Sequence, residues 1–211
     1  SANHAAFNLI FRFVENYISP IAGRISSQRH VMAIRDGFIS AMPFMIVGSF
    51  LLVFAYPPFS PDTTWGFARA WLDLAKEFEG RILTPFDMTM GIMSIYICAA
   101  ISYNLGKHYE KSNQLDPFMC AMLSIMAFLL IAAPKTNGTL PVDSLGGTGI
   151  FTAILVAIYC VEMMRFLKAH NIGIRLPDQV PPMIKNSFDL LIPVLVVVLT
   201  LYPLSLFIQH H

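Results

Sequence analysis

The sequence has 211 residues, of which 55% are apolar and only 13% carry a charge, and its formal net charge is +1. About a quarter of the residues of an average soluble domain are charged, so this composition indicates a chain that folds in lipid. A nearly neutral chain without a basic stripe interleaved with aromatic residues is also a poor candidate for nucleic-acid binding. The three cysteines, Cys98, Cys120 and Cys160, each lie in an apolar run, which is typical of small buried residues and not of a disulfide or metal framework.

Residues 1–35 are predicted to contain a helix that lies along the membrane surface. Large apolar residues recur at helical spacing from Phe7 to Ile18 and form one face. About three turns are too short to cross a bilayer, which favours a helix at the interface. A helix that packs against the rest of the protein would show the same spacing, and this alternative stays open. Gly23 and Ser26–Ser27 are predicted to break the helix before a basic segment.

Five further apolar stretches have the length and composition of membrane-spanning helices, which need about 20 apolar residues to cross the hydrocarbon layer. They cover residues 36–56, 86–104, 117–133, 149–167 and 188–208, within a membrane domain of residues 36–208. The sequence therefore predicts an all-α membrane protein with five transmembrane helices plus interfacial amphipathic helices.

An acidic and aromatic segment separates the first two predicted spans. Its large apolar residues fall on one helical face, which is typical of a helix that rests on the outer membrane interface. These residues are Phe67, Trp71, Leu74 and Phe78. A tryptophan at that depth usually anchors the protein in the interface. Because sugar sites also use tryptophan faces, Trp71 is kept as a candidate substrate-side residue.

The basic residues predict a cytoplasmic N-terminus. With the N-terminus inside and five spans, ten of the 14 lysines and arginines fall in inner segments and four in outer ones. The inner group is Arg12, Arg24, Arg29, Arg35, Lys107, Lys111, Arg165, Lys168, Arg175 and Lys185, and the outer group is Arg69, Lys76, Arg81 and Lys135. Lysine and arginine concentrate on the cytoplasmic side of membrane proteins, and the inverted topology would reverse this bias.

A basic, proline-rich segment at residues 165–193 separates the fourth and fifth spans. Three prolines within six residues exclude a continuous helix, because proline lacks a backbone donor and disfavours helix in the residue before it. Alternating apolar side chains predict an extended cytoplasmic arm at residues 169–186. The four cations of this region are candidates for contact with a cytoplasmic partner, and they are Arg165, Lys168, Arg175 and Lys185.

Two stretches of the sequence resemble a known family of membrane proteins. The run LPDQVPPMIKNSFDLLIP resembles the loop before the fifth membrane helix of sugar-permease IIC components. These permeases belong to the bacterial phosphoenolpyruvate-dependent phosphotransferase system, in its lactose, cellobiose and diacetylchitobiose branch. The stretch QRHVMAIRDGFISAMP resembles the start of the first span in the same family.

The resemblance implies the N-terminal scaffold and dimerisation part of a permease in the bacterial inner membrane. Such a permease translocates a β-linked disaccharide, which a cytoplasmic IIB partner phosphorylates. In this family most of the sugar site lies in the C-terminal half, with a histidine in an Ile-His-Gly context and a glutamate in Asn-Glu-Pro. Neither motif occurs in this sequence. We therefore expect the chain by itself to be neither an enzyme nor a transporter, and to form a homodimer through its fifth span, near Val196 and Leu199.

Few side chains could carry chemistry. Ionisable groups at membrane depth are functional candidates by default, so Asp87 and Glu162 join Trp71 as candidate substrate-side residues. Glu162 lies three residues before Arg165, and a structural ion pair at this spacing is the competing interpretation.

His30, His108 and His170 have no carboxylate or cysteine partner at metal-ligand spacing, and we predict that they are surface residues. The sequence contains no nucleophile-elbow or zinc-protease motif. We therefore predict no catalytic residue, no cofactor and no metal site.

Two other functions stay open at this stage. An intramembrane enzyme that acts on a lipid-linked sugar could use Asp87 or Glu162, although no paired carboxylate is evident at matching depth. A stand-alone membrane assembly module would also fit the composition. Sugar binding by the purified protein would separate the permease from the enzyme, and a longer reading frame would separate the permease from the assembly module.

Overall fold

The computed structural model describes residues 2–134 and 137–210, and within these ranges the chain forms helices and no β-strand. The α-helices are α1 (Ala2–Phe13), α2 (Ser19–Ser26), α3 (Arg29–Ala55), α4 (Gly66–Met88), α5 (Met93–His108), α6 (Glu110–Asn113), α7 (Pro117–Ala132), α8 (Ile150–Ala169), α9 (Pro182–Asp189) and α10 (Leu191–Gln209). A π-helical turn, η1 (Val14–Ile18), joins α1 to α2, and the 3-10 turns η2 (Met90–Ile92) and η3 (Gly147–Gly149) precede α5 and α8. The prediction of an all-α membrane protein is confirmed.

Helix α5 lies at the centre of the bundle, where it packs against α3, α7 and α8. Its buried residues recur every three or four positions, so they line one side of the helix. They are Ser94, Ile97, Cys98, Ile101, Ser102, Leu105 and Gly106. Helix α10 completes the bundle by packing against α7 and α8. Helices α3 and α8, which carry His30 and Glu162, are therefore both packed against α5.

Small residues allow α3 to approach α5 closely. The buried side of α3 carries alanines and glycines at Ala33, Gly37, Ala41 and Gly48. A Cβ atom added at Gly37 would overlap Ile101 of α5, including its backbone. Close approach through small side chains is the usual way that helices associate in lipid, because an apolar surface is as favourable against lipid as against another helix.

The three cysteines lie at the meeting point of α5, α7 and α8. Cys98, Cys120 and Cys160 are fully buried and unpaired. The prediction that they are small apolar residues of the core is confirmed.

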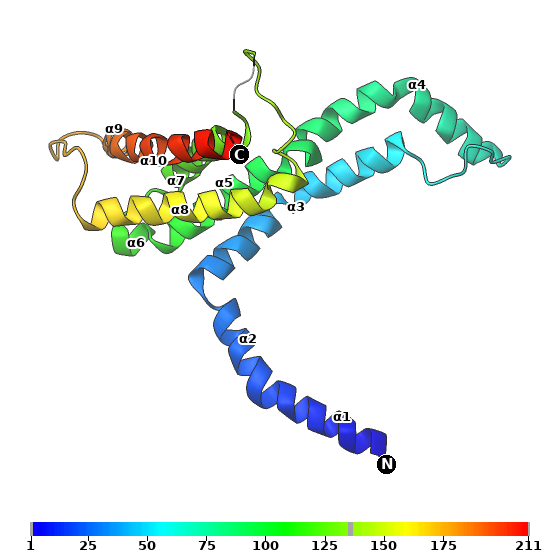
Figure 1. Cartoon of the computed structure of the whole chain (residues 1–211), viewed down its shortest axis with the longest axis horizontal. Coiled ribbons are helices and arrows are strands. Elements are labelled where there is room, and N and C mark those ends of the chain that lie inside the picture. The colour runs from blue at the N-terminus through cyan, green and yellow to red at the C-terminus, as the bar shows by residue number, and fades with distance from the viewer. Residues whose placement is uncertain (1, 135–136, 211) are drawn as a thin grey trace.

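The N-terminal helix projects away from the bundle, as Figure 1 shows for the blue segment. The helix predicted between Phe7 and Ile18 is present, but α1, η1 and α2 continue it to Ser26. Gly23 does not break the helix, because glycine inside a helix costs only about 1 kcal/mol relative to alanine. The helix ends at Ser26, which agrees with the predicted break at Ser26–Ser27. Residues 3–29 are all exposed, and α2 touches the start of α3 and little else.

Helices α3 and α4 form a hairpin that extends to the other side of the bundle (Figure 1). The helix predicted around Trp71 is present, but α4 runs on to Met88. The stretch predicted as the second span, residues 86–104, is not one continuous helix, because the chain breaks at Thr89 and α5 begins at Met93. The Thr89 hydroxyl donates to the carbonyl of Pro85 at 2.9 Å, which closes the end of α4.

Three helices are long and apolar enough to cross a membrane, by length and composition within the described residues: Arg29–Ala55, Gly147–Ala169 and Pro182–Gln209. Helices α4 and α5 would together form a fourth, with a bend of 40° between them. The remaining apolar helix, α7, has only 16 residues. The count of five spans stays a prediction.

The predicted arm is extended only in its first part. Residues 171–181 contain no helix, but α9 begins at Pro182 and covers the rest of the arm. Proline is favoured in the first turn of a helix, where its missing N–H has no partner to lose. The prolines at 177 and 181 therefore interrupt the chain, whereas Pro182 starts a new helix.

Candidate functional site

A polar cluster around Glu162 joins three helices at one end of the bundle. The Oε2 atom of Glu162 lies 2.7 Å from Arg165 Nη2, so the ion pair at spacing i,i+3 is present. Its Oε1 atom lies 2.6 Å from His30 Nε2 and accepts a hydrogen bond from the Tyr109 hydroxyl at 2.5 Å. Because His30 belongs to α3, Tyr109 follows α5, and Glu162 lies in α8, the cluster ties these helix ends together.

Local sequence places each of these groups. Helix α3 begins where the side chain of Gln28 accepts a hydrogen bond from the Val31 N–H at 2.9 Å, so His30 stands in its first turn. Tyr109 is the residue at which α5 ends, and it is 1% exposed. Its ring lies 5.3 Å from the Arg29 guanidinium and 4.6 Å from that of Arg165. Two cations therefore flank one aromatic ring.

The environment keeps the Tyr109 phenol neutral. Burial raises the pKa of Tyr109, and the carboxylate of Glu162 raises it further, whereas the two arginines lower it. The neutral phenol can then donate a hydrogen bond to Glu162. Both carboxylate oxygens of Glu162 are thus occupied, which favours a structural role for this residue over contact with a substrate.

The prediction that His30 is a surface histidine is wrong. Its side chain is 29% exposed and contacts Glu162, which lies 132 residues later in the sequence. His108 and His170 are exposed, as predicted. Tyr109 was missed altogether. A single sequence carries no local signal that pairs residues so far apart, so only the fold could identify His30 and Tyr109 as partners of Glu162.

A second polar group surrounds a cavity of about 370 Å³ beside the Glu162 cluster. The cavity lies between α6, the end of α8, the arm and the start of α10. Lys168 and Arg175 both line it, and Lys168 forms an ion pair with Asp189 at 3.0 Å. Helix α8 therefore directs Glu162 and Arg165 towards α3 and the end of α5, and Lys168 towards the end of α9.

The four predicted partner-facing cations do not form one surface patch. Arg165 belongs to the Glu162 cluster, whereas Lys168 and Arg175 line the cavity. Lys185 lies in α9, where its Nζ is 3.6 Å from Asp178 Oδ1. The arm is also fastened to α7 by a hydrogen bond from Asn186 Nδ2 to Asp116 Oδ2 at 3.0 Å.

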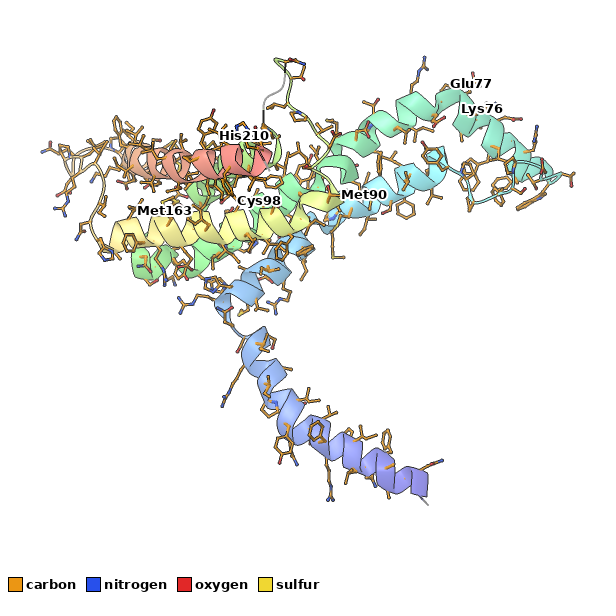
Figure 2. The ribbon with its side chains drawn as sticks, viewed as in Figure 1. Lys76, Glu77, Met90, Cys98, Met163 and His210 are labelled. Atoms are coloured by element: carbon orange, nitrogen blue, oxygen red, sulfur yellow. The ribbon has the colours of Figure 1, made fainter. Side chains whose placement is uncertain are left out.

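The three candidate substrate-side residues are not brought together. Figure 2 labels Met163, the neighbour of Glu162, and Lys76 of α4 at well-separated places along the molecule. Trp71 lies in a groove of about 650 Å³ between α3 and α4 that is lined only by apolar residues. Its indole N–H donates to the carbonyl of Phe54 at 3.3 Å. A wall without polar groups suits an interfacial anchor better than a sugar platform. Asp87 is exposed in the last turn of α4.

The described residues contain no cluster of three or more histidine, cysteine, aspartate or glutamate side chains that could hold a metal ion. Chemistry at this end of the bundle is therefore that of ion pairs and hydrogen bonds. The arrangement can fix helix ends, bind an anion or contact another protein.

Comparison with known proteins identifies relatives over most of the chain. The family model for the phosphotransferase system, EIIC, matches residues 35–210. The cellobiose-specific EIIC component from Geobacillus stearothermophilus is 35% identical over 206 residues, which cover 89% of this chain and 43% of the relative. The lactose-specific EIICB component from Streptococcus mutans is 33% identical over 196 residues, which cover 90% of this chain and 33% of the relative.

One solved structure is similar in both sequence and fold. The crystal structure of the transporter ChbC, the IIC component of the N,N'-diacetylchitobiose-specific phosphotransferase system, superposes with a TM-score of 0.76 at 32% identity. The match covers 94% of this chain and 47% of ChbC. The chain thus spans less than half the length of the relatives that it matches.

Proposed function

Because the chain belongs to the EIIC family of the phosphotransferase system, we propose that it forms the N-terminal scaffold and dimerisation part of a sugar permease. The observation that carries this proposal is the match to ChbC, which covers nearly all of this chain and about half of that transporter. The direct packing of α5 against α3, α7 and α8 suits a supporting part better than the moving, sugar-binding part.

The proposed substrate is a β-linked disaccharide. Relatives are named for cellobiose, lactose and lichenan, and the structural neighbour is named for diacetylchitobiose. All of these names refer to β-linked saccharides. The sugar would be bound mostly outside this chain, since Trp71 lies in an apolar groove and both carboxylate oxygens of Glu162 are occupied.

The proposed protein partner is a cytoplasmic IIB component. The lactose-specific relatives are named EIICB, which joins the two components in one name. The arm that carries Arg175 and Lys185 is a suitable surface, because it is exposed yet fastened by the Lys168–Asp189 and Asn186–Asp116 contacts. The IIB partner would then transfer the phosphoryl group, and this chain would support the part of the permease that binds the sugar.

The membrane placement follows from the same proposal. The chain would lie in the bacterial inner membrane with its N-terminus in the cytoplasm and the exposed α1–α2 helix on the membrane surface. Helix α10 would form the seam of a homodimer, because it carries large exposed apolar residues such as Leu199, at 65% exposure.

A transport assay tests the permease proposal. Membrane vesicles would contain either this chain alone or the longest reading frame that includes it, together with a IIB component. Uptake of radiolabelled cellobiose, lactose and diacetylchitobiose is expected only with the longer reading frame. Uptake by this chain alone, or no uptake of any β-linked disaccharide by the longer protein, would contradict the proposal.

Cross-linking tests the dimer. Cysteines placed at Leu199 or at Val196 should give a covalent dimer in membranes, whereas a cysteine at Phe67 of α4 should not. A monomeric mass in mild detergent with no cross-linked product would remove α10 as the seam.

The two other functions have no observation in their favour. Both oxygens of Glu162 are occupied, and Asp87 is exposed in the last turn of α4, so neither belongs to a paired acid site in the described residues. The match to part of a longer transporter also gives no support to a stand-alone assembly module.

A further inference from the structure

We propose that the cavity between α6, the end of α8 and the arm is a binding site for a phosphate-bearing anion. The proposal rests on the residues that line the cavity and does not depend on the permease function. Two sources could supply the anion: the headgroup of an anionic phospholipid, or a free phosphate compound in the cytoplasm.

The cavity has a polar rim rich in hydrogen-bond donors and an aliphatic wall. The residues that line it include Lys168, Arg175, Asn113, Gln114 and Asn171, whose side chains carry N–H donors. Its wall is made by aliphatic side chains such as Leu167 of α8. A volume of about 370 Å³ is large enough for a phosphate group with a glycerol or sugar moiety attached.

The charge balance of the cavity is positive. Asp189 is the only carboxylate among the described residues that line it, and Lys168 already pairs with Asp189 at 3.0 Å. Arg175 forms no ion pair with any carboxylate in residues 2–134 and 137–210. No carboxylate of the described residues therefore compensates its charge. A guanidinium offers five N–H donors in a planar fork that matches the oxygens of a phosphate.

The helix end beside the cavity does not cancel this charge. The last turn of α8 would normally present free carbonyl oxygens, which repel an anion. Here the chain turns back, with Asn171 at a φ of 53°, and backbone N–H groups cover these carbonyls. The N–H of Ile172 donates to Leu167 at 2.9 Å, and that of His170 donates to Phe166 at 3.1 Å.

The position of the cavity suits a lipid headgroup. It lies where α8 ends and where α9 joins α10, and these helices belong to the candidate spans Gly147–Ala169 and Pro182–Gln209. The ends of such helices lie at the level of the lipid phosphates, and basic pockets between them bind anionic headgroups. The aliphatic wall would then contact the glycerol backbone, while Arg175 and Lys168 contact the phosphate.

Two variants of the arm form a matched test. Arg175→Gln removes one positive charge from the cavity. Lys185→Gln removes one from the same arm, outside the cavity, where Lys185 faces Asp178.

Phosphatidylglycerol binding to each purified protein would be measured by native mass spectrometry. Phosphate-free dioleoylglycerol serves as the neutral lipid. Arg175→Gln should weaken phosphatidylglycerol binding by about tenfold, the typical loss for a hydrogen bond to a charged group. Lys185→Gln should change it less than twofold.

Competition distinguishes the two sources. If millimolar inorganic phosphate or glycerol 3-phosphate displaces the lipid from the unaltered protein but not from Arg175→Gln, the natural ligand is a free phosphate compound. If neither displaces it, the ligand is the lipid headgroup.

Arg175→Lys keeps the positive charge without the planar guanidinium and should restore part of the affinity for phosphatidylglycerol. Equal losses in Arg175→Gln and Lys185→Gln, or equal binding of phosphatidylglycerol and dioleoylglycerol, would overturn the proposal. The circular dichroism spectrum of each variant reports whether it is folded.

Discussion

Helix α5 and the N-terminal α1–α2 helix are both apolar, yet α5 is packed in the core and the α1–α2 helix is exposed. Every turn of α5 contributes a buried residue to the core. The α1–α2 helix carries many large apolar residues, such as Phe11 at 57% exposure, and none of those in η1 or α2 is buried. Hydrophobicity therefore does not decide which helices of this protein pack together.

The glycines of the two regions indicate what does decide it. A Cβ added at Gly37 of α3 would overlap Ile101 of α5, whereas a Cβ added at Gly23 of α2 would meet nothing within 4 Å. An apolar side chain that moves from lipid to the protein interior lowers its free energy only a little. Close fit between small residues therefore selects the helices that pack. The α1–α2 helix lacks such a fit, so its apolar face stays exposed, and its placement on the membrane surface remains a prediction.

The largest expected effect comes from truncating one phenylalanine in each region. Phe128 of α7 is fully buried, so Phe128→Ala should cost about 3–5 kcal/mol through lost contacts and a cavity. Phe11→Ala should change the free energy of unfolding by less than about 0.5 kcal/mol, as is usual for surface positions. Thermal unfolding in a mild detergent measures both. Similar losses from the two variants would mean that α1 packs on the bundle in solution.

Adding a methyl group gives the second comparison. Gly37→Ala should destabilise the bundle by about 1–3 kcal/mol, because α3 and α5 must separate to accept it. Gly23→Ala should be neutral or slightly stabilising, since alanine is the better helix former. The same unfolding assay compares them. A neutral Gly37→Ala would show that the contact between α3 and α5 tolerates separation.

The smallest effect concerns the pH dependence of the packed end. The pKa of Tyr109 is raised by burial and by Glu162, so its neutral form is favoured in the folded state. The stability that this form contributes is fully present below the ordinary tyrosine pKa of about 10 and is lost as the pH rises through the raised value. Tyr109→Phe should cost about 1 kcal/mol near neutral pH and remove this alkaline loss.

An unchanged alkaline profile in Tyr109→Phe would mean that another group governs stability there. Tyr17 of the projecting helix gives the control. It is 64% exposed, and Tyr17→Phe should leave both the neutral stability and the alkaline profile as they are.

Periodicity and composition predicted most of the helices, but not how the helix ends are joined. Helices α7 and α8 agree to within two residues with the stretches 117–133 and 149–167, because a proline or a glycine-rich turn starts each helix. The helix break near the second predicted span was not found, because Pro85 does not end α4, and the chain turns four residues later at Thr89.

The candidate site was only partly predictable, since it depends on contacts between distant parts of the chain. The Glu162–Arg165 pair followed from spacing within one helix. His30 and Tyr109 could not be found in this way, because each reaches Glu162 from a different helix. The cavity beside Arg175 forms only when the arm folds back against α6 and α8.

The burial of all three natural thiols has a practical consequence for spectroscopy. Cys98, Cys120 and Cys160 lie in the core with no exposed surface, so maleimide and spin-label reagents cannot reach them in the folded protein. Single cysteines could therefore be introduced at exposed positions of α1, the arm or α10 without first removing the natural ones. The unaltered protein, treated with the same reagent, is then the control for labelling of the natural cysteines.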